Sequence, residues 1–508
     1  MINAIAMKCK IFLAGAALCL SVFSQAQNDA DALRYAMLQF GSTARALGSG
    51  GAYGAVGGDF GGVSINPAGL GVYRSSEFQF SPGFSFTGAS TDFNGSLVND
   101  SRANVHIGSM SLVFTDLNDR YRYGSGMRRA STNFAIGVNR LASFSSGREF
   151  NGFNSDNSLL DSYTEFLNSG SGTAPSDAFN ADPFGAGLAY DAFLLNPIPG
   201  DTSRYYSVVP DGNVLQNRRL TSRGSVSEMV IALAANFGHK LYIGGSVGVP
   251  FLKYVEDAVY SESDRDESIP GFSSFSQRNS LETRGTGLNA KFGIIVRPIE
   301  ALRLGASVHS PTRYRLRDEF SSEINADIET NNYQVFSPFG LFDYTLRSPW
   351  RAVGSATVLV KEYGFISLDY EYLDYGFSAF DFSRGGLGFE SEEAELNTQI
   401  DGKYTRAHNL RGGVEGVSGP MRFRAGYSYL GTPFAEGRAT ADADLSRHSF
   451  HGGIGYRGES FFADLSYVHS LSTFGEVPYQ LADASEPIPF ARTEQTAGTA
   501  VLSMGVRF

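Results

Sequence analysis

Cysteine is almost absent from this sequence of 508 residues, and the two cysteines both lie near its start. Cys9 and Cys19 fall in a segment that carries two lysines, an apolar run over residues 11–23 and the small-x-small sequence Ser-Gln-Ala ending at Ala26. This pattern predicts a secretory signal peptide over residues 1–26. Because cleavage after Ala26 removes both thiols, we expect an exported chain with neither a disulfide nor a thiolate metal ligand.

Long apolar runs and basic stretches are lacking as well. No stretch reaches the roughly 18 to 20 apolar residues that a transmembrane helix needs, which argues against a helical inner-membrane protein. The formal net charge is -11, and no basic stretch is present to neutralise phosphates. Nucleic acid is therefore excluded as a partner.

Glycine and aromatic residues are abundant instead. The chain holds 59 Gly, 40 Phe and 25 Tyr, whereas charged residues make up only 18%. This mixture favours strands, aromatic girdles and tight turns over helical bundles. No shift in composition marks a linker between large halves, so we expect one large architecture.

The last strand shows the clearest periodicity. Apolar side chains alternate with small or polar ones over residues 499–508, and the chain ends on Phe508. Period two over this length predicts a β-strand. The alternation recurs along the chain and predicts about fourteen strands, near residues 77–87, 103–115, 131–143, 224–238, 240–256, 278–296, 301–318, 340–360, 364–376, 404–417, 420–431, 446–457, 461–470 and 495–508. An even number of strands suits a closed barrel.

The connections between these strands alternate in length. Short turns are followed by long polar links, as in outer-membrane barrels with short periplasmic turns and long external loops. The link over residues 116–130 is longer than such a turn should be. One face of each strand is apolar and the other carries small or charged side chains, which must face a lumen because charge on a lipid-facing wall is costly. These charged residues are Lys291, Asp369, Glu371, Arg422, Arg424 and Asp464, and we expect them to hold a plug rather than to orient a substrate carboxylate.

A barrel of this size leaves a lumen that needs filling. Residues 27–75, ahead of the first strand, are the candidate, because residues 31–40 place apolar side chains at helical spacing and residues 48–62 are rich in Gly and Ala. A flexible linker is the alternative, although a linker has no need of an amphipathic helix. We predict an all-β fold, a transmembrane antiparallel barrel over residues 76–508 with this N-terminal hatch inside it.

The hatch segment resembles that of a known family. The run ALGSGGAYGAVGGDFGGVSINPAGLG at residues 46–71 is similar to the hatch of the FadL/TodX family of outer-membrane transporters for hydrophobic compounds, and Asn66, Pro67 and Ala68 match its Asn-Pro-Ala motif. The segments GASVHSPTRY (305–314), LDYEYLDY (368–375) and RAGYSYLGTP (424–433) resemble its barrel strands. The resemblance implies uptake of long-chain fatty acids or similar compounds across the outer membrane of a Gram-negative bacterium. It also implies lateral exit at a kinked third strand, for which Gly137 is the candidate.

The longest insertion, residues 144–223, is too long for a hairpin connection and is expected to be a functional external loop. Ser158 is placed to cap one helix, and Asp182-Pro183 is placed to start a second. An apolar face on these helices could capture ligand, or the helices could simply pack together as a lid. The residues concerned are Leu159, Leu160, Tyr163, Phe166, Phe184, Leu188, Phe193 and Leu194.

Other functions compete with transport. The sequence Gly244-Gly245-Ser246-Val247-Gly248 matches a hydrolase nucleophile elbow, but it lies within an alternating strand, so an enzyme is not expected. A haem or metal receptor lacks ligands, because His448 and His451 fall on opposite faces of one strand. We therefore expect no cofactor. A non-transporting secretion shuttle of the same fold stays open, and the expected partners are a hydrophobic small molecule, outer-membrane lipid and, through the terminal Phe508, the barrel-assembly machinery.

Overall fold

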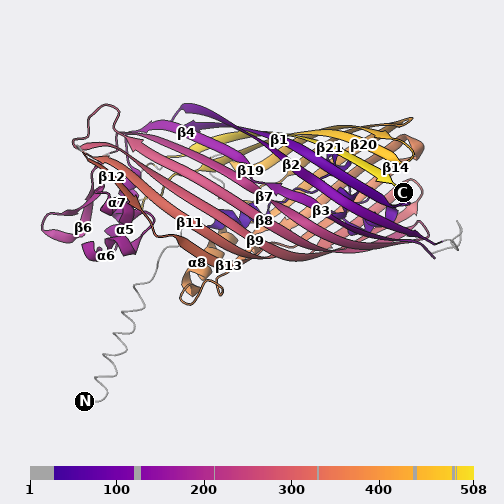
Figure 1. Ribbon diagram of the computed structural model, residues 1–508, viewed down its shortest axis with the longest axis horizontal. Coiled ribbons are helices and arrows are strands. Elements are labelled where there is room, and N and C mark those ends of the chain that lie inside the picture. The colour runs from indigo at the N-terminus through magenta and orange to yellow at the C-terminus, as the bar shows by residue number, and fades with distance from the viewer. Residues whose placement is uncertain are drawn as a thin grey trace, which may run out of the picture.

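The computed structural model describes residues 28–118, 128–210, 212–328, 331–438, 443–482, 487 and 489–508. Within these residues the chain forms a closed antiparallel β-barrel of fourteen wall strands, drawn lengthwise in Figure 1. The predicted all-β barrel with an internal hatch is therefore confirmed. The predicted signal peptide lies outside the described residues, as do residues 119–127 of the long link after the second strand.

Most of the strands are longer than the alternating pattern alone indicated. They are β1 (Glu77–Phe93), β2 (Ser96–Leu117), β3 (Arg129–Ser143), β4 (Ser146–Asn154), β5 (Leu195–Ile198), β6 (Asp201–Ser207), β7 (Val214–Phe237), β8 (Leu241–Ser263), β9 (Phe272–Ile299), β10 (Leu302–His309), β11 (Arg313–Ile328), β12 (Asn331–Phe336), β13 (Gly340–Arg347), β14 (Arg351–Val360), β15 (Gly364–Asp374), β16 (Ala379–Asp381), β17 (Arg406–Ser418), β18 (Met421–Leu430), β19 (Asp444–Arg457), β20 (Phe461–Glu476) and β21 (Ala491–Arg507).

Three wall strands are each interrupted once, so that β3 continues as β4, β10 as β11 and β13 as β14. The barrel closes where β1 pairs on one side with β2 and on the other with β21, from Glu77↔Arg507 to Phe93↔Ala491. Four short strands are not counted among the fourteen wall strands. β12 forms a hairpin with β11, β16 pairs with β13, and β5 and β6 form a separate two-stranded sheet.

The wall has the two faces that its period-two pattern predicts. In β21, Leu502, Met504 and Val506 are exposed on the outside, whereas Val501 and Ser503 are buried toward the lumen. Because the strands are long, their outer ends extend well past a membrane.

The helices in the described residues are short and none of them is part of the wall. Those of the hatch are α2 (Asp29–Ala36), α3 (Ala44–Gly48), α4 (Phe60–Val63) and the 3₁₀ helix η1 (Pro67–Val72). Those of the external loops are α5 (Leu159–Leu167), α6 (Pro175–Ala181), α7 (Ala186–Asp191) and α8 (Glu390–Lys403), with the single turn η3 (Tyr375–Phe377), whereas the single turn η2 (Lys361–Tyr363) joins β14 to β15 at the opposite end. None of the helices in the described part of the chain is long and apolar enough to cross a membrane. In Figure 1, α5, α6 and α7 lie at the end of the barrel opposite the C-terminus.

Candidate functional site

The hatch runs along the lumen from its external end to its periplasmic end. At the external end, the Tyr404 hydroxyl donates to Oδ2 of Asp29 at 2.7 Å, just ahead of β17. At the other end, the amide of Phe508 donates to the carbonyl of Ser76 at 3.0 Å. The segment between these contacts is almost entirely buried, so it occupies the lumen as a packed plug.

Asn66 of the predicted motif is a buried hub between hatch and wall. Its Nδ2 donates to the carbonyl of Gly54 at 2.7 Å and to the wall carbonyl of Ile294 at 3.3 Å. Its Oδ1 accepts the amide of Ala68 at 3.0 Å and so caps η1, whose first residue is Pro67. Proline suits this position because the first helical amide has no partner within the helix.

Two wall glycines form the seat of this motif. A Cβ on Gly293 of β9 would lie 1.9 Å from Oδ1 of Asn66, and one on Gly244 of β8 would lie 2.4 Å from the carbonyl oxygen of Pro67. Neither distance leaves room for a side chain. The two glycines therefore let the hatch backbone lie directly on the wall, a role that their alternating positions alone did not indicate.

Wall side chains hold the hatch mainly through its backbone carbonyls. Asn133 Nδ2 donates to Leu70 at 2.9 Å, and Ser307 Oγ donates to Ile65 at 2.7 Å. The ring nitrogens of His309 and His451 each lie 2.8 Å from a hatch carbonyl, that of Ile65 and that of Leu47. Each contact satisfies a buried carbonyl that water cannot reach.

Two charged side chains of the predicted lumenal set, Asp369 and Glu371, help to attach the hatch to the wall. Asp369 Oδ2 accepts the amide of Gly54 at 2.8 Å, which ties β15 to the hatch. Glu371 lies between two buried arginines, Arg351 at 2.7 Å and Arg411, and Arg351 also donates to the hatch carbonyl of Ala36. This cluster is ion-paired within itself and hydrogen-bonded to the hatch through Asp369 and Arg351.

A second cluster lies nearer the periplasmic end. Arg424 pairs with Glu415 at 2.6 Å and with Asp464 at 2.7 Å, and Glu415 also faces Arg45 of the hatch at 3.4 Å. Lys291, by contrast, pairs with Glu228 across the wall.

Arg422 differs from the other charged residues of the predicted lumenal set. It is only half-buried, and its guanidinium donates to the turn carbonyls of Gly419 and Met421. It therefore belongs to the periplasmic turn and not to the hatch attachment.

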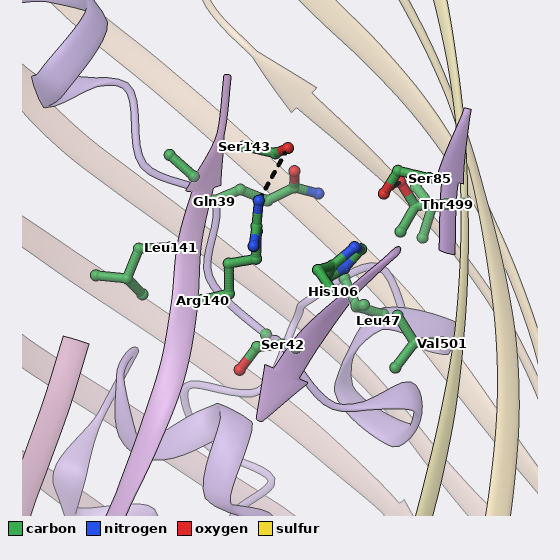
Figure 2. A pocket seen from close by; sticks show the side chains of 14 residues that line it. Gln39, Ser42, Leu47, Ser85, His106, Arg140, Leu141, Ser143, Thr499 and Val501 are labelled. Carbon is green, nitrogen blue, oxygen red and sulfur yellow. Dashed lines mark hydrogen bonds between the residues drawn. The ribbon is translucent and has the colours of Figure 1, made fainter. Parts of the chain in front are cut away.

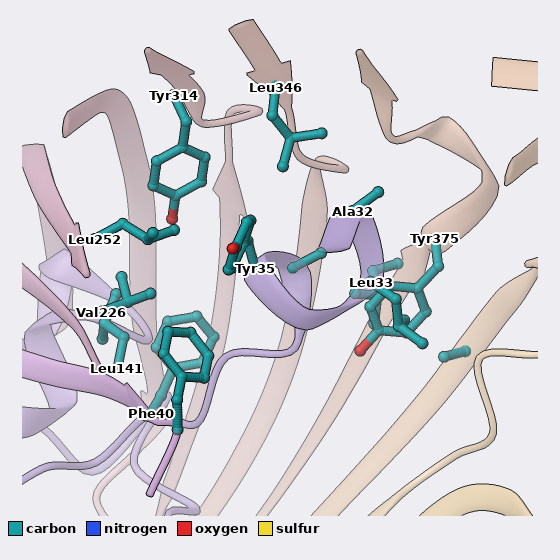
Figure 3. Packing of buried hydrophobic residues seen from close by; sticks show 14 of the residues in the cluster. Ala32, Leu33, Tyr35, Phe40, Leu141, Val226, Leu252, Tyr314, Leu346 and Tyr375 are labelled. Atoms are coloured by element: carbon teal, nitrogen blue, oxygen red, sulfur yellow. The ribbon is translucent and has the colours of Figure 1, made fainter. Parts of the chain in front are cut away.

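Above the glycine-rich part of the hatch, α2 fills the barrel with apolar contacts. Leu33, Tyr35 and Phe40 are buried against wall residues that include Leu252 and Tyr314, as Figure 3 shows. The Tyr35 ring makes an edge contact with Tyr254, with 6.2 Å between the ring centroids. The helix thus blocks the external half of the lumen.

Beside this plug lies a small cavity of about 80 Å³, shown in Figure 2. Part of its lining is apolar, and the rest is polar and comes from the hatch and from β1, β2, β3 and β21. The apolar side chains include Leu47, Leu141, Val468 and Val501, and the polar ones include Gln39, Ser42, Ser85, His106, Arg140, Ser143 and Thr499.

The hydrogen-bonded ladder of the barrel wall is interrupted next to this cavity. β2 and β3 pair only from Ser109↔Asn139 to Leu117↔Ser131. Beyond this point, toward the external end, β2 pairs only with β1, and β3 and β4 pair only with β7 in the described part of the chain. We call this gap the seam. His106 lies on one of its edges and Arg140 on the other, so the cavity sits at its start.

The interruption of the third strand lies beyond the predicted position, Gly137. Both ladders run in register through Gly137, which pairs with Ser111 and Val230. The irregularity on the external side of Gly137 falls between Arg140 and Ala142. A Cβ on Gly137 would lie 2.7 Å from the ring of Phe60 in the hatch. Gly137 therefore makes room for the hatch, and the kink arises where β3 loses its partner β2.

Arg140 carries a charge that no acid in the described residues neutralises. Its guanidinium donates weakly to Ser143 Oγ at 3.3 Å and to the carbonyl of Gly224 at 3.4 Å, and no carboxylate there lies within 4.0 Å of it. Its Nε and the Nδ1 of His106 are buried without a partner. The cavity thus offers an unused donor, Nε of Arg140, and an unpartnered ring nitrogen of His106 beside apolar side chains.

The external loop folds as a lid over the barrel mouth. Ser158 caps α5 as predicted, with Oγ accepting the amide of Leu160 at 3.0 Å. Asp182-Pro183 does not start a helix: Asp182 ends α6, and its carboxylate accepts the amides of Phe184 and Ala186 across a turn that leads into α7. Burial raises the pKa of Asp182, and these hydrogen bonds oppose the shift.

Most of the predicted capture residues face inward. Leu159, Leu160, Leu188 and Leu194 are buried in one apolar cluster with the outer ends of the wall strands, and Tyr163 and Phe166 pack on it half-buried. Phe184 is also buried, with its ring 4.9 Å from that of Phe320. Phe193 is the exception at 52% exposed, with its ring 4.8 Å from that of Tyr333. In this state the helices pack on each other, so the lid interpretation describes the observed arrangement.

Buried polar contacts fasten the lid to the wall. Glu262 at the outer end of β8 accepts hydrogen bonds from Ser158, the amide of Leu159 and Gln216. Gln216 in turn reaches the hydroxyl of Tyr479 at 2.8 Å. The helix start at Ser158 is thereby joined to two different strands and a second loop.

The motifs of the competing functions fall in ordinary wall positions. The sequence from Gly244 to Gly248 lies inside β8 with no strand-to-helix turn. His448 lies on the outside of β19 with its Nδ1 2.7 Å from the hydroxyl of Tyr427, whereas His451 points inward at the hatch. No group of metal-binding residues is found in the described residues.

This architecture defines a class of protein, the transmembrane β-barrel with an internal hatch and an interrupted third strand. No protein-family model matches the sequence, and no curated protein matches it. Solved structures do match. A FadL homologue from Pseudomonas aeruginosa aligns with a TM-score of 0.53 over 93% of this chain and 98% of its own, at 12% identity.

The Pseudomonas putida toluene transporter TodX aligns with a TM-score of 0.53 over 93% of this chain and 99% of its own, at 14% identity. A TodX mutant described as a monoaromatic hydrocarbon channel gives 0.53 over 93% and 100%, at 15% identity. The chain thus has the fold of the FadL and TodX barrels.

Proposed function

We propose that this protein takes up hydrophobic small molecules across the outer membrane of a Gram-negative bacterium and releases them sideways through the seam. The observation that carries the proposal is the cavity at the seam, where apolar side chains adjoin a break in the barrel wall. Diffusion straight down the lumen is blocked, because α2 and the hatch fill it.

The lining of the cavity favours an amphiphile with an acidic head over a pure hydrocarbon. Arg140 has no acidic partner in the described residues, and guanidinium is the side chain best suited to a carboxylate. Leu141 and Val501 supply apolar contacts for the adjoining chain. A long-chain fatty acid has this combination of an anionic end and an apolar tail.

The path requires movement at two places. The apolar faces of the lid are buried, so the lid must lift before Leu160 or Leu188 can contact a ligand. The cavity is too small for a long alkyl chain, so the hatch must shift beside the seam. Phe193, exposed at the lid surface, is the natural first contact for a ligand.

Ligand binding to the purified barrel in mild detergent tests the proposal. We expect dodecanoate to bind more tightly than dodecanol, and Arg140→Gln to remove the difference. Arg422→Gln, which changes the same charge at a periplasmic turn, serves as the control. Equal affinity for dodecanoate and dodecanol would overturn the proposal that the ligand has an acidic head group.

Failure to bind any alkyl ligand would overturn transport. A co-purifying Soret band would then indicate a haem receptor, and a stoichiometric protein partner would indicate a secretion shuttle.

A further inference from the structure

Three arginines lie side by side on the outer surface of the barrel. Arg313 and Arg315 point outward from β11, and Arg313 stands directly opposite Arg347 of β13 in the antiparallel ladder. On its other side, Arg313 stands opposite Leu288 of β9. We call these three residues the arginine cluster.

The cluster lies where the lipid-facing band ends. Along β9, outward apolar residues run from Leu288 through Phe292 to Val296. About ten residues separate Leu288 from the periplasmic turn, which is roughly 33 Å of strand. At a tilt of about 40° this gives a height of about 25 Å, the thickness of the apolar band of such barrels. Leu288 and the neighbouring Arg313 therefore mark its outer edge.

An aromatic side chain marks the same level. Trp350, three residues after Arg347, packs on Tyr372 with 5.8 Å between ring centroids. Tryptophan and tyrosine gather at membrane-water interfaces, where one end of the side chain is apolar and the other is wet.

Charges farther out on the same strands are paired, whereas those of the cluster are not. Arg317, two residues beyond Arg315, forms two hydrogen bonds with Asp343 at 2.9 and 2.8 Å. Lys253 faces Glu282 at 3.1 Å. In the described residues no carboxylate lies within 4.0 Å of an arginine of the cluster.

The acids nearest to the cluster in the ladder already have partners. Asp343 lies diagonally from Arg315 and pairs with Arg317, and Asp381 lies diagonally from Arg347 and accepts the amide of Ser383 at 3.1 Å. Diagonal neighbours in a ladder lie about 7 to 8 Å apart. Like charges directly opposite each other in a ladder are destabilising. Arg313 and Arg347 are such a pair, so this surface calls for an anion from outside the chain.

We propose that the arginine cluster binds the phosphate of a phosphorylated lipid in the outer leaflet of the membrane. The guanidinium groups would contact the phosphate oxygens, for which their planar donor geometry is well suited. The acyl chains would lie on the exposed apolar wall directly below, at Leu288, Phe292 and Val308. The adjoining apolar surface distinguishes this site from one for a free anion.

Native mass spectrometry of the mature barrel in detergent, with bis-phosphorylated lipid A as the probe, tests this site. We expect the triple variant Arg313→Gln, Arg315→Gln, Arg347→Gln to weaken binding about 100-fold, at roughly five-fold for each arginine. A matched control replaces three exposed arginines that are already ion-paired, Arg219, Arg278 and Arg406, by Gln and should bind as the unchanged protein does.

A comparison without any variant guards against misfolding: lipid A stripped of both phosphates should bind the unchanged barrel as weakly as intact lipid A binds the triple variant. Equal binding of the two lipids, or equal binding by the two triple variants, would overturn the site. Displacement of lipid A by millimolar inorganic phosphate would show an isolated anion site and would overturn the lipid as its occupant.

Discussion

Replacing Gly293 by alanine is expected to loosen the hatch. The added Cβ would lie 1.9 Å from Oδ1 of Asn66 and 3.1 Å from Cδ of Pro67, so Asn66 must move. Once it moves, its hydrogen bonds to Gly54, Ile294 and Ala68 are lost together. A single methyl group in the wall thereby undoes the cap of η1.

The free-energy cost of the Gly293→Ala substitution follows from these contacts. Overpacking a buried site costs about 1 to 3 kcal/mol. Each buried hydrogen bond adds about 0.5 to 1.5 kcal/mol. With three hydrogen bonds lost, the total is about 3 to 7 kcal/mol, and every 1.4 kcal/mol is a factor of ten. The population of states in which the hatch is locally detached should therefore rise at least about 100-fold.

Gly245→Ala is the matched control. The neighbouring position in β8 faces outward, and its nearest heavy atom to a new Cβ is 3.7 Å away. There alanine should be neutral or slightly stabilising, because glycine in a strand costs conformational entropy.

Hydrogen exchange of the hatch amides, including that of Ala68, measures the difference, and single-channel conductance in planar bilayers gives a second measurement. Equal protection of the Ala68 amide from hydrogen exchange in the two variants would refute the role of Gly293 in seating Asn66 on the wall.

Three further predictions concern other attachments. Burial raises the pKa of Asp31 in α2 from 3.8 to about 6, so the docked helix should lose up to about 3 kcal/mol of stability as the pH rises from about 4 through about 6. Hydrogen exchange of α2 against pH should show this slope, and Asp31→Asn should flatten it; a slope unchanged in that variant would contradict the assignment. Arg424→Met leaves Asp464 without one of its two arginines and should lower the free energy of unfolding by about 3 to 5 kcal/mol. Heat-modifiability gels should then show a lower unfolding temperature. An unchanged unfolding temperature would show that the cluster does not fasten the hatch. Ser158→Ala removes the cap of α5 and the hydrogen bond from Ser158 to Glu262. Limited proteolysis should therefore cut the lid faster in this variant than in the exposed control Ser155→Ala. Equal cleavage rates would contradict the role of Ser158 in attaching the lid to the wall.

The wall of the barrel could be predicted from sequence because lipid and lumen impose opposite demands on alternate residues. Leu502, Ser503 and Met504 satisfy those demands in order, and so do the corresponding residues of the other thirteen wall strands. Burial of one face is a local property of a strand. It therefore leaves a local pattern that needs no knowledge of neighbouring strands.

The sites of contact between elements leave no such pattern. The break after Asn139 depends on where β2 stops pairing with β3, which is a property of two strands that no single stretch contains. Gly293 and Gly137 look like ordinary small lumenal residues until Asn66 and Phe60 are placed against them. The start of α7 was misplaced for a related reason, since Asp182 caps a turn rather than a helix in this packed lid.

The contact between the hatch and the last strand has a consequence for how the chain assembles. Ser503 of β21 accepts the amide of Ala44 at 2.8 Å and shares a hydrogen bond with Ser81 of β1. The N-terminal hatch is therefore hydrogen-bonded to the last strand, β21, where β21 pairs with β1 and closes the barrel. Docking of the hatch thus adds a hydrogen bond at the junction that closes the barrel, and we expect closure to be less stable in a chain without its hatch.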